Sequence, residues 1–304
     1  MAIDYDVRDR VAYLTINNPG KANVLDRATS HALSDAWKEA WEDRDVRAVV
    51  ITGAGDRHFC AGHNLAPPEG VSAEEMEFLR SRRMFWPPAG TVNGTRIGAD
   101  VRMGDHYPQI WKPVISAING WAAGAGLYLM LASTDIRIAC AEHARFKFAL
   151  LSQGWIGAGP GATLLSKQLR YADAMRVLLT DEPFDADEAF RMGLINEVVP
   201  HDSLLERATE IALQIAEMPP VAVRMMKEFV VRYREMPVDS AWHVQSLMNT
   251  MLIQMTADGD EGREAFNEKR PPEFTGAIRR KGEPFREPTP EEWERLDEMR
   301  HGAH

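Results

Sequence analysis

The chain has few cysteines and no long apolar segment, and both absences narrow its class. Cys60 and Cys140 are too few for a disulfide framework, and neither lies in a Cys/His cluster typical of zinc sites. The most apolar helical stretch, residues 121–133, is shorter than the roughly 20 residues that span a bilayer. Residues 1–10 lack the apolar region of a signal peptide. We therefore expect a soluble, cytoplasmic protein without a membrane partner.

Positive charge is also scarce. The chain has 35 Lys and Arg against 45 Asp and Glu, a formal net charge of −10 at pH 7. Because an acidic surface repels phosphate backbones, we expect no nucleic-acid partner. The sequence has neither a GxxxxGK[ST] loop nor a strand-coupled GxGxxG, which argues against a nucleotide-binding switch.

Apolar patterns in the first two thirds of the chain predict alternating strands and helices. Apolar residues alternate from Tyr5 to Ile16, with a turn at Asp9-Arg10, as in two adjacent strands. The β-branched run over residues 46–52 predicts a strand buried on both faces. The other predicted elements are a helix over 28–43, a strand over 113–118, a small-residue turn over 120–126, a helix from there to 133 and a strand over 135–140. This alternation predicts an α/β fold with parallel pairing.

Beyond residue 200 the pattern is helical throughout. Apolar spacing and proline punctuation predict helices over 204–218, 222–234, 240–257 and 261–269. With 304 residues, 45% of them hydrophobic, the chain can bury one large core. We therefore divide it into an α/β core over 1–199, a helical C-terminal region over 200–276 and a charged tail over 277–304.

Two loops of small residues follow predicted strands, at residues 59–65 (FCAGHNL) and 119–126 (NGWAAGAG). Small residues let the backbone approach a ligand closely, and N–H groups at a helix start carry positive partial charge. Two such groups aimed at one point would stabilise an oxyanion, such as a thioester carbonyl gaining enolate character. For one loop alone, a tight turn that binds nothing is the better interpretation, so the hypothesis depends on the pair.

The pair and its surroundings resemble the crotonase (enoyl-CoA hydratase/isomerase) family over residues 3–276. Four ordered motifs carry the resemblance, at residues 59–65, 112–126, 193–199 and 261–276. The first matches an AGx[DN][LI] loop, and the second matches KPxIAAxNGxAxGGG, with Ala125 in place of the middle glycine. The third matches GL[IV]xxVV, and the fourth matches EGxxAFxEKRxPxFxG.

This resemblance implies an α/β crotonase-like spiral of ββα units with a helical C-terminal trimerisation region. The implied assembly is a homotrimer, or a hexamer made of two trimers. The implied substrate is an acyl-CoA thioester, and no prosthetic group is implied, since coenzyme A enters as part of the substrate. By position, His63 and Ala125 would supply the two N–H groups of the oxyanion hole.

The resemblance also places the coenzyme A end. Lys21 and Ala22 occupy the loop that lines the nucleotide, and the backbone of Ala61 would meet the adenine. Phe266 and Lys269 match a C-terminal pair in which the ring packs on adenine and the ammonium meets a phosphate. A fixed cation suits a phosphate on an acidic protein, although a solvated helix charge is the alternative interpretation of Lys269.

Hydratases of this family use two glutamates to place and activate water, and this sequence has neither. The first position is Tyr128 and the second is Leu150. A third acid position, used by some members, falls in residues 157–160, which read Gly-Ala-Gly-Pro. We therefore expect chemistry other than standard hydration.

Four candidate acid or base groups remain: Tyr128, His63, His106 and Tyr107. Tyr128 faces the pocket by position and is the first choice, although an aromatic pocket wall explains it equally well. The His63 side chain is either catalytic or a polar part of the wall. His106 and Tyr107 lie in the long connection over 66–111, which borders the acyl pocket in the family and is otherwise an ordinary surface loop. The aromatic residues of this connection suggest a bulky acyl group.

Two functions from different classes stay open. The first is an acyl-CoA hydrolase, C–C lyase, decarboxylase or isomerase, with a true hydratase ranked below these. The second is a catalytically silent CoA-binding or assembly protein, which would keep the coenzyme A residues while lacking both glutamates. Turnover of acyl-CoA thioesters separates the two.

Overall fold

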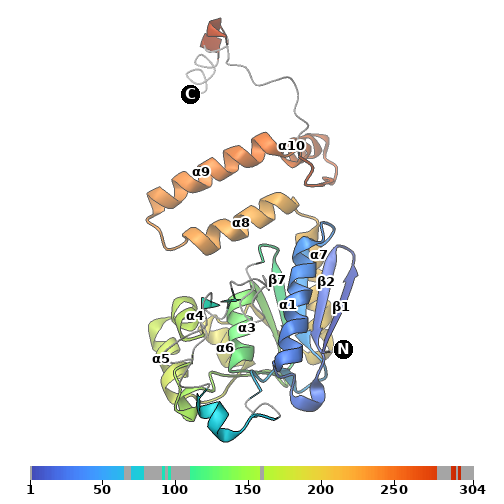
Figure 1. Ribbon diagram of the computed structural model, residues 1–304. Helices are drawn as coiled ribbons and strands as arrows, with labels where there is room; N and C mark the ends of the chain where they lie inside the picture. The colour runs from blue at the N-terminus through green and yellow to red at the C-terminus, as the bar shows by residue number, and fades with distance from the viewer. Residues whose placement is uncertain are drawn as a thin grey trace.

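The structure is a computed structural model that describes residues 2–64, 70–78, 91–92, 95–96, 110–157, 161–278, 289–291 and 294–295. Within these residues the strands form two larger sheets and one short pair (Figure 1). In spatial order the first sheet holds β1 (Ile3–Arg8), β2 (Val11–Ile16), β3 (Ala48–Gly53), β7 (Val114–Ile118), β9 (Ile136–Cys140) and β12 (Glu197–Val199). The second holds β11 (Phe184–Asp185), β10 (Arg145–Lys147), β8 (Trp121–Ala123) and β4 (His58–Cys60), and the short pair is β5 (Thr91–Val92) with β6 (Thr95–Arg96).

The helices divide between the sheets and the C-terminal region. Those of the core are α1 (Arg27–Glu42), α3 (Ala125–Ser133), α4 (Gly161–Gln168), α5 (Tyr171–Thr180), α6 (Ala186–Met192) and α7 (Leu204–Ala216). Three short 3₁₀ turns join them: η1 (Pro19–Lys21), η2 (Leu151–Gln153) and η3 (His201–Ser203). The C-terminal region holds α8 (Pro220–Tyr233), α9 (Val238–Met255) and α10 (Asp258–Glu268), and residues 73–78 are also helical. Among the helices described, none combines the length and apolar composition needed to cross a bilayer.

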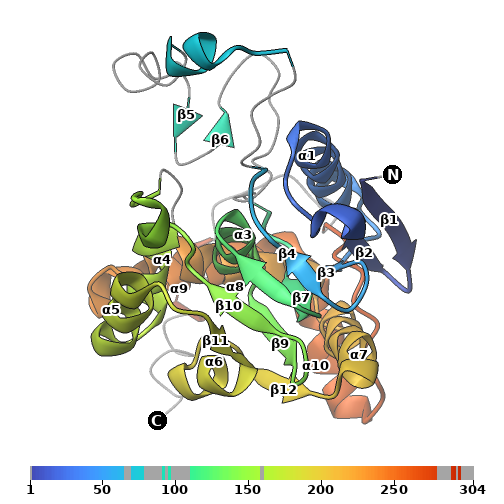
Figure 2. The same ribbon diagram turned by 90° about the horizontal axis from the view of Figure 1, so that it is seen from below.

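The first sheet is the centre of the core. Its strands from β2 to β12 pair in parallel, while β1 and β2 form an antiparallel hairpin. At the hairpin turn Asp9 and Arg10 have φ values of 50° and 64°, as a two-residue turn with positive φ at both positions requires. Figure 2 shows α7 on one face of this sheet, and α1 with the second sheet on the other. Because both faces are covered, the side chains of β7 are all buried.

The C-terminal helices lie beyond the amino ends of the parallel strands. In Figure 1, α8 separates α9 from the rest of the molecule. The Lys227 ammonium of α8 donates to the carbonyl of Lys112 at 2.8 Å and pairs with Asp135 at 2.7 Å, just before β7 and β9. Arg47, just before β3, donates to the carbonyls of Ala216 at 2.9 Å and Phe274 at 2.6 Å. These contacts tie the C-terminal region to the amino edge of the sheet.

Two buried asparagines join the carboxyl ends of the strands to the second sheet. The Asn23 amide donates to the carbonyls of Ala54 at 3.0 Å and His58 at 2.7 Å. The Asn119 amide donates to the carbonyls of Gly55 at 2.6 Å and His58 at 3.3 Å. The two side chains are 0% and 4% exposed. Both therefore set the position of His58, where β4 begins.

The α/β fold, its parallel pairing and the helices beyond residue 200 are confirmed. The turn predicted over 120–126 is wrong in part, because residues 121–123 form β8 between β4 and β10. A three-residue strand carries too little pattern to be recognised locally, and its partners come from distant parts of the chain. The division into domains stays a prediction. Most of the tail over 277–304 lies outside the described residues.

We expect Asn119→Asp to destabilise the fold by about 3 kcal/mol, because a buried carboxylate would face carbonyl oxygens that lose their donor. Chemical denaturation measures this change. Asn267→Asp, at an exposed position on α10, is the matched control and is expected to stay within about 0.5 kcal/mol of the wild type. Equal stability of Asn119→Asp and the wild type would contradict the anchoring role.

Candidate active site

The first small-residue loop leaves β4 and runs along the segment that follows η1. The Ala61 N–H donates to the Ala22 carbonyl at 3.1 Å, and the Leu25 N–H donates to the Gly62 carbonyl at 2.8 Å. The second of these bonds, together with the Asn64 N–H that donates to the Leu25 carbonyl at 3.4 Å, forms a parallel bridge between Leu25 and His63. Such a bridge uses the groups of the residues on either side of His63, so the His63 N–H points away from Leu25.

The second loop leads from β8 into the N-terminus of α3. Gly124 precedes the helix with a φ of 51°, a conformation that favours glycine, and its N–H donates to the Lys147 carbonyl at 3.2 Å. The first intrahelical bond runs from the Tyr128 N–H to the Gly124 carbonyl at 3.1 Å. The N–H groups at the start of α3, beginning with that of Ala125, therefore have no acceptor within the helix.

The structure packs these two loops backbone to backbone. A Cβ built on Gly62 would lie 2.8 Å from the Ala123 oxygen and 3.0 Å from the Ala125 nitrogen. A Cβ on Gly126 would overlap the carbonyl oxygen of Cys60. The residue after Gly62 is His63, so the amides of His63 and Ala125 lie on segments in direct contact. That both point at one acyl oxygen stays a prediction.

Tyr128 projects from the first turn of α3 into an apolar surrounding. Its ring is 5.9 Å from that of Phe148 between centroids. The ring lies against the backbone of Gly161, where a Cβ would overlap it, and a Cβ on Gly157 would lie 2.8 Å from its hydroxyl. Tyr128 is 5% exposed, and its hydroxyl is buried without a hydrogen-bond partner among the described residues.

The three positions at which the family carries its acids come together in space. Leu150 follows β10 and reaches toward Gly157, where a Cβ would overlap its side chain. The same glycine faces the Tyr128 hydroxyl. At these positions the chain therefore presents a phenol, an aliphatic side chain and a glycine in place of carboxylates. Residues 158–160 lie outside the described part.

Comparison with known proteins agrees with this geometry. The sequence model of the enoyl-CoA hydratase/isomerase family matches residues 6–83 and 101–277. The chain belongs to this family. It is 32% identical to (E)-benzylidenesuccinyl-CoA hydratase of Thauera aromatica over 91% of this chain and 100% of that protein. It is also 32% identical to carnitinyl-CoA dehydratase of Salmonella typhi over 86% and 94%.

Solved structures of the enoyl-CoA hydratase/isomerase family share the fold. An enoyl-CoA hydratase from Bacillus anthracis superposes with a TM-score of 0.77 at 30% identity, covering 91% of this chain and 100% of that one. An enoyl-CoA hydratase/isomerase from Mycobacterium paratuberculosis gives 0.75 at 30% identity, covering 91% and 99%. The crotonase-like fold expected from the motifs is therefore confirmed.

The residues expected at the coenzyme A end fall into two separate groups. Lys21, Ala22 and Ala61 lie together, because the Ala61 N–H bonds to Ala22. Phe266 and Lys269 lie on and just after α10, at the end of the molecule opposite η1 (Figure 1). The Phe266 ring is 82% exposed. A single chain of this family member therefore does not bring the two groups together.

Two of the candidate acid or base residues cannot be placed, and the structure shows one buried acid that the sequence did not point to. His106 and Tyr107 lie outside the described residues. Asp181, at the end of α5, is 4% exposed and bonds to the segment that carries Leu150. Nothing in its local sequence, Thr-Asp-Glu-Pro, distinguishes it from a surface turn, so only the fold reveals it.

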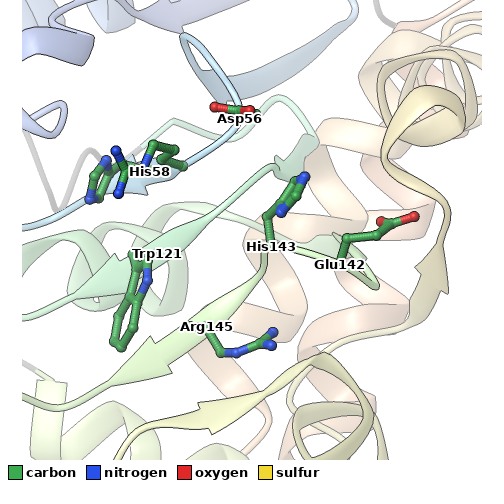
Figure 3. A pocket seen from close by; sticks show the side chains of 7 residues that line it. Asp56, His58, Trp121, Glu142, His143 and Arg145 are labelled. Carbon is green, nitrogen blue, oxygen red and sulfur yellow. The ribbon is translucent and has the colours of Figure 1, made fainter.

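A further pocket of about 270 Å³ lies beside β4 and β8 and is bordered by Trp121 of the second loop (Figure 3). It is lined by both charge signs and by two imidazoles, from Asp56, Arg57, His58, Trp121, Glu142, His143 and Arg145. The pKa of His58 is lowered by burial and by the charge of Arg57. Most of its charged side chains are exposed to solvent, and none of the catalytic or coenzyme A residues expected from the sequence lines it.

We expect Gly62→Ala to reduce turnover of this enzyme at least tenfold, because the added methyl would push the two amide-bearing loops apart. Gly62 also has a φ of 98°, so the substitution adds backbone strain. Gly193→Ala is the matched control, since Gly193 has a φ of 77° but open space around it. Steady-state kinetics of both variants tests the contact, and equal losses would contradict it.

Proposed function

We propose that this protein is an acyl-CoA thioester enzyme that stabilises an enolate or oxyanion with the N–H groups of His63 and Ala125. The direct packing of Gly62 against Ala125 carries the proposal, since it puts the two amide-bearing segments side by side. Backbone donors fixed before the reaction cost no reorganisation as charge develops on the thioester oxygen. The substitution of alanine for glycine at 125 leaves such a donor intact.

The reaction at the acyl group differs from two-glutamate hydration. Tyr128 and Leu150 replace both carboxylates, so Tyr128 is the protonatable group proposed to meet the substrate. Burial raises the pKa of Tyr128, and the charge of Asp181 raises it further. A phenol with a raised pKa stays protonated at neutral pH, and therefore donates a hydrogen bond to an acyl oxygen and does not abstract a proton.

The acyl group is proposed to be bulky. Because residues 157 and 161 are glycines, the Tyr128 ring can form one wall of the proposed acyl pocket. Phe148 and Leu150 extend this apolar surface. A relative at 32% identity acts on benzylidenesuccinyl-CoA by its name, which denotes an aromatic acyl group. That relative is a hydratase, so hydration stays among the outcomes of the test. Hydrolysis, C–C cleavage, decarboxylation and isomerisation are the others.

The test is turnover of a panel of linear, cyclic and aromatic acyl-CoA thioesters in H₂¹⁸O, followed by mass spectrometry. Hydration adds one labelled water, hydrolysis labels the released acid, and decarboxylation or C–C cleavage removes a fragment. Isomerisation leaves the mass unchanged and is detected by deuterium exchange. Binding of thioesters with no turnover across the panel would support the catalytically silent CoA-binding protein, which the loss of both carboxylates also favours.

We expect Tyr128→Phe to lower kcat by about 100-fold, the lower end of the range for loss of one positioned hydrogen-bond donor to developing charge. Its melting temperature is expected to be unchanged or higher, because the hydroxyl is buried without a partner among the described residues. Tyr5→Phe is the matched control, since the Tyr5 hydroxyl is also buried and unpartnered within those residues but lies in β1. An unchanged kcat in Tyr128→Phe would contradict a role of the phenol as a donor and would support Tyr128 as part of the pocket wall.

The coenzyme A end is proposed to be completed by another copy of the chain. Because one chain separates Lys21 from Lys269, the C-terminal residues of a neighbour would reach the nucleotide in a homotrimer or hexamer. Large apolar side chains exposed on α8 and α9 would be covered in such an assembly, among them Met226, Val231, Trp242, Leu247 and Met251.

We expect Lys269→Ala to raise the KM for acyl-CoA several-fold without raising the KM for the matching acyl-pantetheine thioester, which lacks the nucleotide. Lys38→Ala, at an exposed position on α1, is the control. Light scattering establishes the number of chains for each variant. A Lys269→Ala enzyme with unchanged KM for both substrates would remove this residue from the nucleotide site.

A further inference from the structure

Asp181 is a buried carboxylate that binds the segment carrying Leu150, and its contacts have consequences beyond the pKa of Tyr128. It follows α5 in the left-handed conformation, with a φ of 50° and a ψ of 28°. The residue is 4% exposed, which is rare for an aspartate without a specific role. A non-glycine residue in this conformation is also uncommon, so the position combines two unfavourable features.

The carboxylate is held by hydrogen bonds from one short segment. It accepts from the Ala149 N–H at 2.5 Å, the Ser152 N–H at 2.8 Å and the Ser152 hydroxyl at 2.6 Å. Burial raises the pKa of Asp181, but these bonds and the charge of Lys147 outweigh it, so the pKa lies below its usual value. Asp181 is therefore an anion at neutral pH, and its donors lie on both sides of Leu150.

The segment that Asp181 holds is the wall opposite Tyr128. Leu150 lies between the two bonded residues and reaches Gly157, and the Tyr128 hydroxyl faces the same glycine. Phe148, directly before the segment, packs its ring 5.9 Å from that of Tyr128. Three hydrogen bonds to one carboxylate thus restrain the segment that carries Leu150.

The charge of Asp181 also acts on Tyr128 itself. The elements around Tyr128 carry these titratable or charged groups among the described residues: His58 and Cys60 on β4, His63 after it, Arg145 and Lys147 on β10, Lys167 on α4 and Asp181 after α5. Burial is the main cause that raises the pKa of Tyr128, and the charge that adds to it is that of Asp181. A nearby anion disfavours the phenolate and so preserves the O–H as a donor.

We propose that Asp181 is a positioning residue for the acyl site: its carboxylate fixes residues 149–152 against Tyr128 and holds the phenol as a hydrogen-bond donor toward an oxygen of the acyl group. This rests on the proposed function, in which Tyr128 meets the substrate. The carboxylate itself acts through the wall and the phenol and does not touch the substrate. The substrate class is thereby narrowed to acyl-CoA thioesters with a hydrogen-bond-accepting oxygen on the acyl chain.

Asp181→Asn tests the charge directly, with no substrate present. The protein is labelled with 3-fluorotyrosine, which lowers the phenol pKa into an accessible range, and the ¹⁹F resonance of Tyr128 is identified by its absence in Tyr128→Phe. We expect the resonance of the folded wild type to stay constant up to a higher pH than that of Asp181→Asn. Coincident titration curves of the two proteins would overturn the charge effect.

The kinetic arm tests the positioning. With any thioester that the wild type turns over, we expect Asp181→Asn to lower kcat by about tenfold, with KM changed less than about twofold, as loss of an alignment effect predicts. The loss is expected to be larger for thioesters with an oxygen on the acyl chain than for those without one. Equal losses for both kinds, or none, would contradict the proposal.

Asp173→Asn is the matched control. Asp173 lies on the same helix α5, is 9% exposed and pairs with Arg170 at 3.0 Å and Arg191 at 2.8 Å. We expect this variant to lower the melting temperature while leaving the Tyr128 titration and kcat unchanged. If kcat and the Tyr128 titration changed by the same amount in Asp173→Asn and Asp181→Asn, Asp181 would contribute only to the stability of the fold.

Two further outcomes separate this proposal from the proposed function. If Asp181→Asn does not fold, Ser152→Ala decides, because it removes one bond to the carboxylate and keeps the charge. It is expected to lower kcat several-fold at unchanged KM, and an unaltered kcat would contradict the proposal. If the wild type turns over no thioester, the proposed function fails, while the ¹⁹F titration still decides the coupling of Asp181 to Tyr128.

Discussion

The direct contact between two stretches of main chain, at Gly62 and Ala125, is the constraint on which the candidate site depends. A side chain at Gly62 or Gly126 would meet backbone atoms of the other loop, and backbone cannot swing aside as a flexible side chain can. The contact leaves no room for a side chain at Gly62 between the two loops. An acidic chain can in this way stabilise negative charge with backbone dipoles and without a cation.

Two buried asparagine side chains restrain these loops through hydrogen bonds. The side chains of Asn23 and Asn119 both donate to the carbonyl of His58, at the start of the strand that leads into the first loop. A polar group buried without a partner is costly, so each of these bonds restricts where that strand can lie. The two loops of the proposed oxyanion hole are thus held by polar groups, and the proposed acyl site beside them has apolar and aromatic side chains.

The acyl side of the site contrasts with the oxyanion side. On the proposed oxyanion side the donors are backbone N–H groups, so the side chains at His63 and Ala125 can vary without loss of these donors. On the acyl side the chemistry depends on side chains, and here the chain has Tyr128 and Leu150. A buried anion, Asp181, supports both through the segment it binds. Family membership therefore predicts the thioester site better than it predicts the reaction.

Local patterns in the sequence were enough to predict β3, the helices beyond residue 200 and the two small-residue loops, because periodicity and steric demands act over a few residues. The second sheet was missed, since strands as short as β8 acquire their partners only by packing. Tertiary structure alone decided that Asp181 lies beside Tyr128, and that Phe266 and Lys269 lie far from Lys21. Contacts between residues distant in sequence depend on how whole elements pack, and no local pattern encodes that.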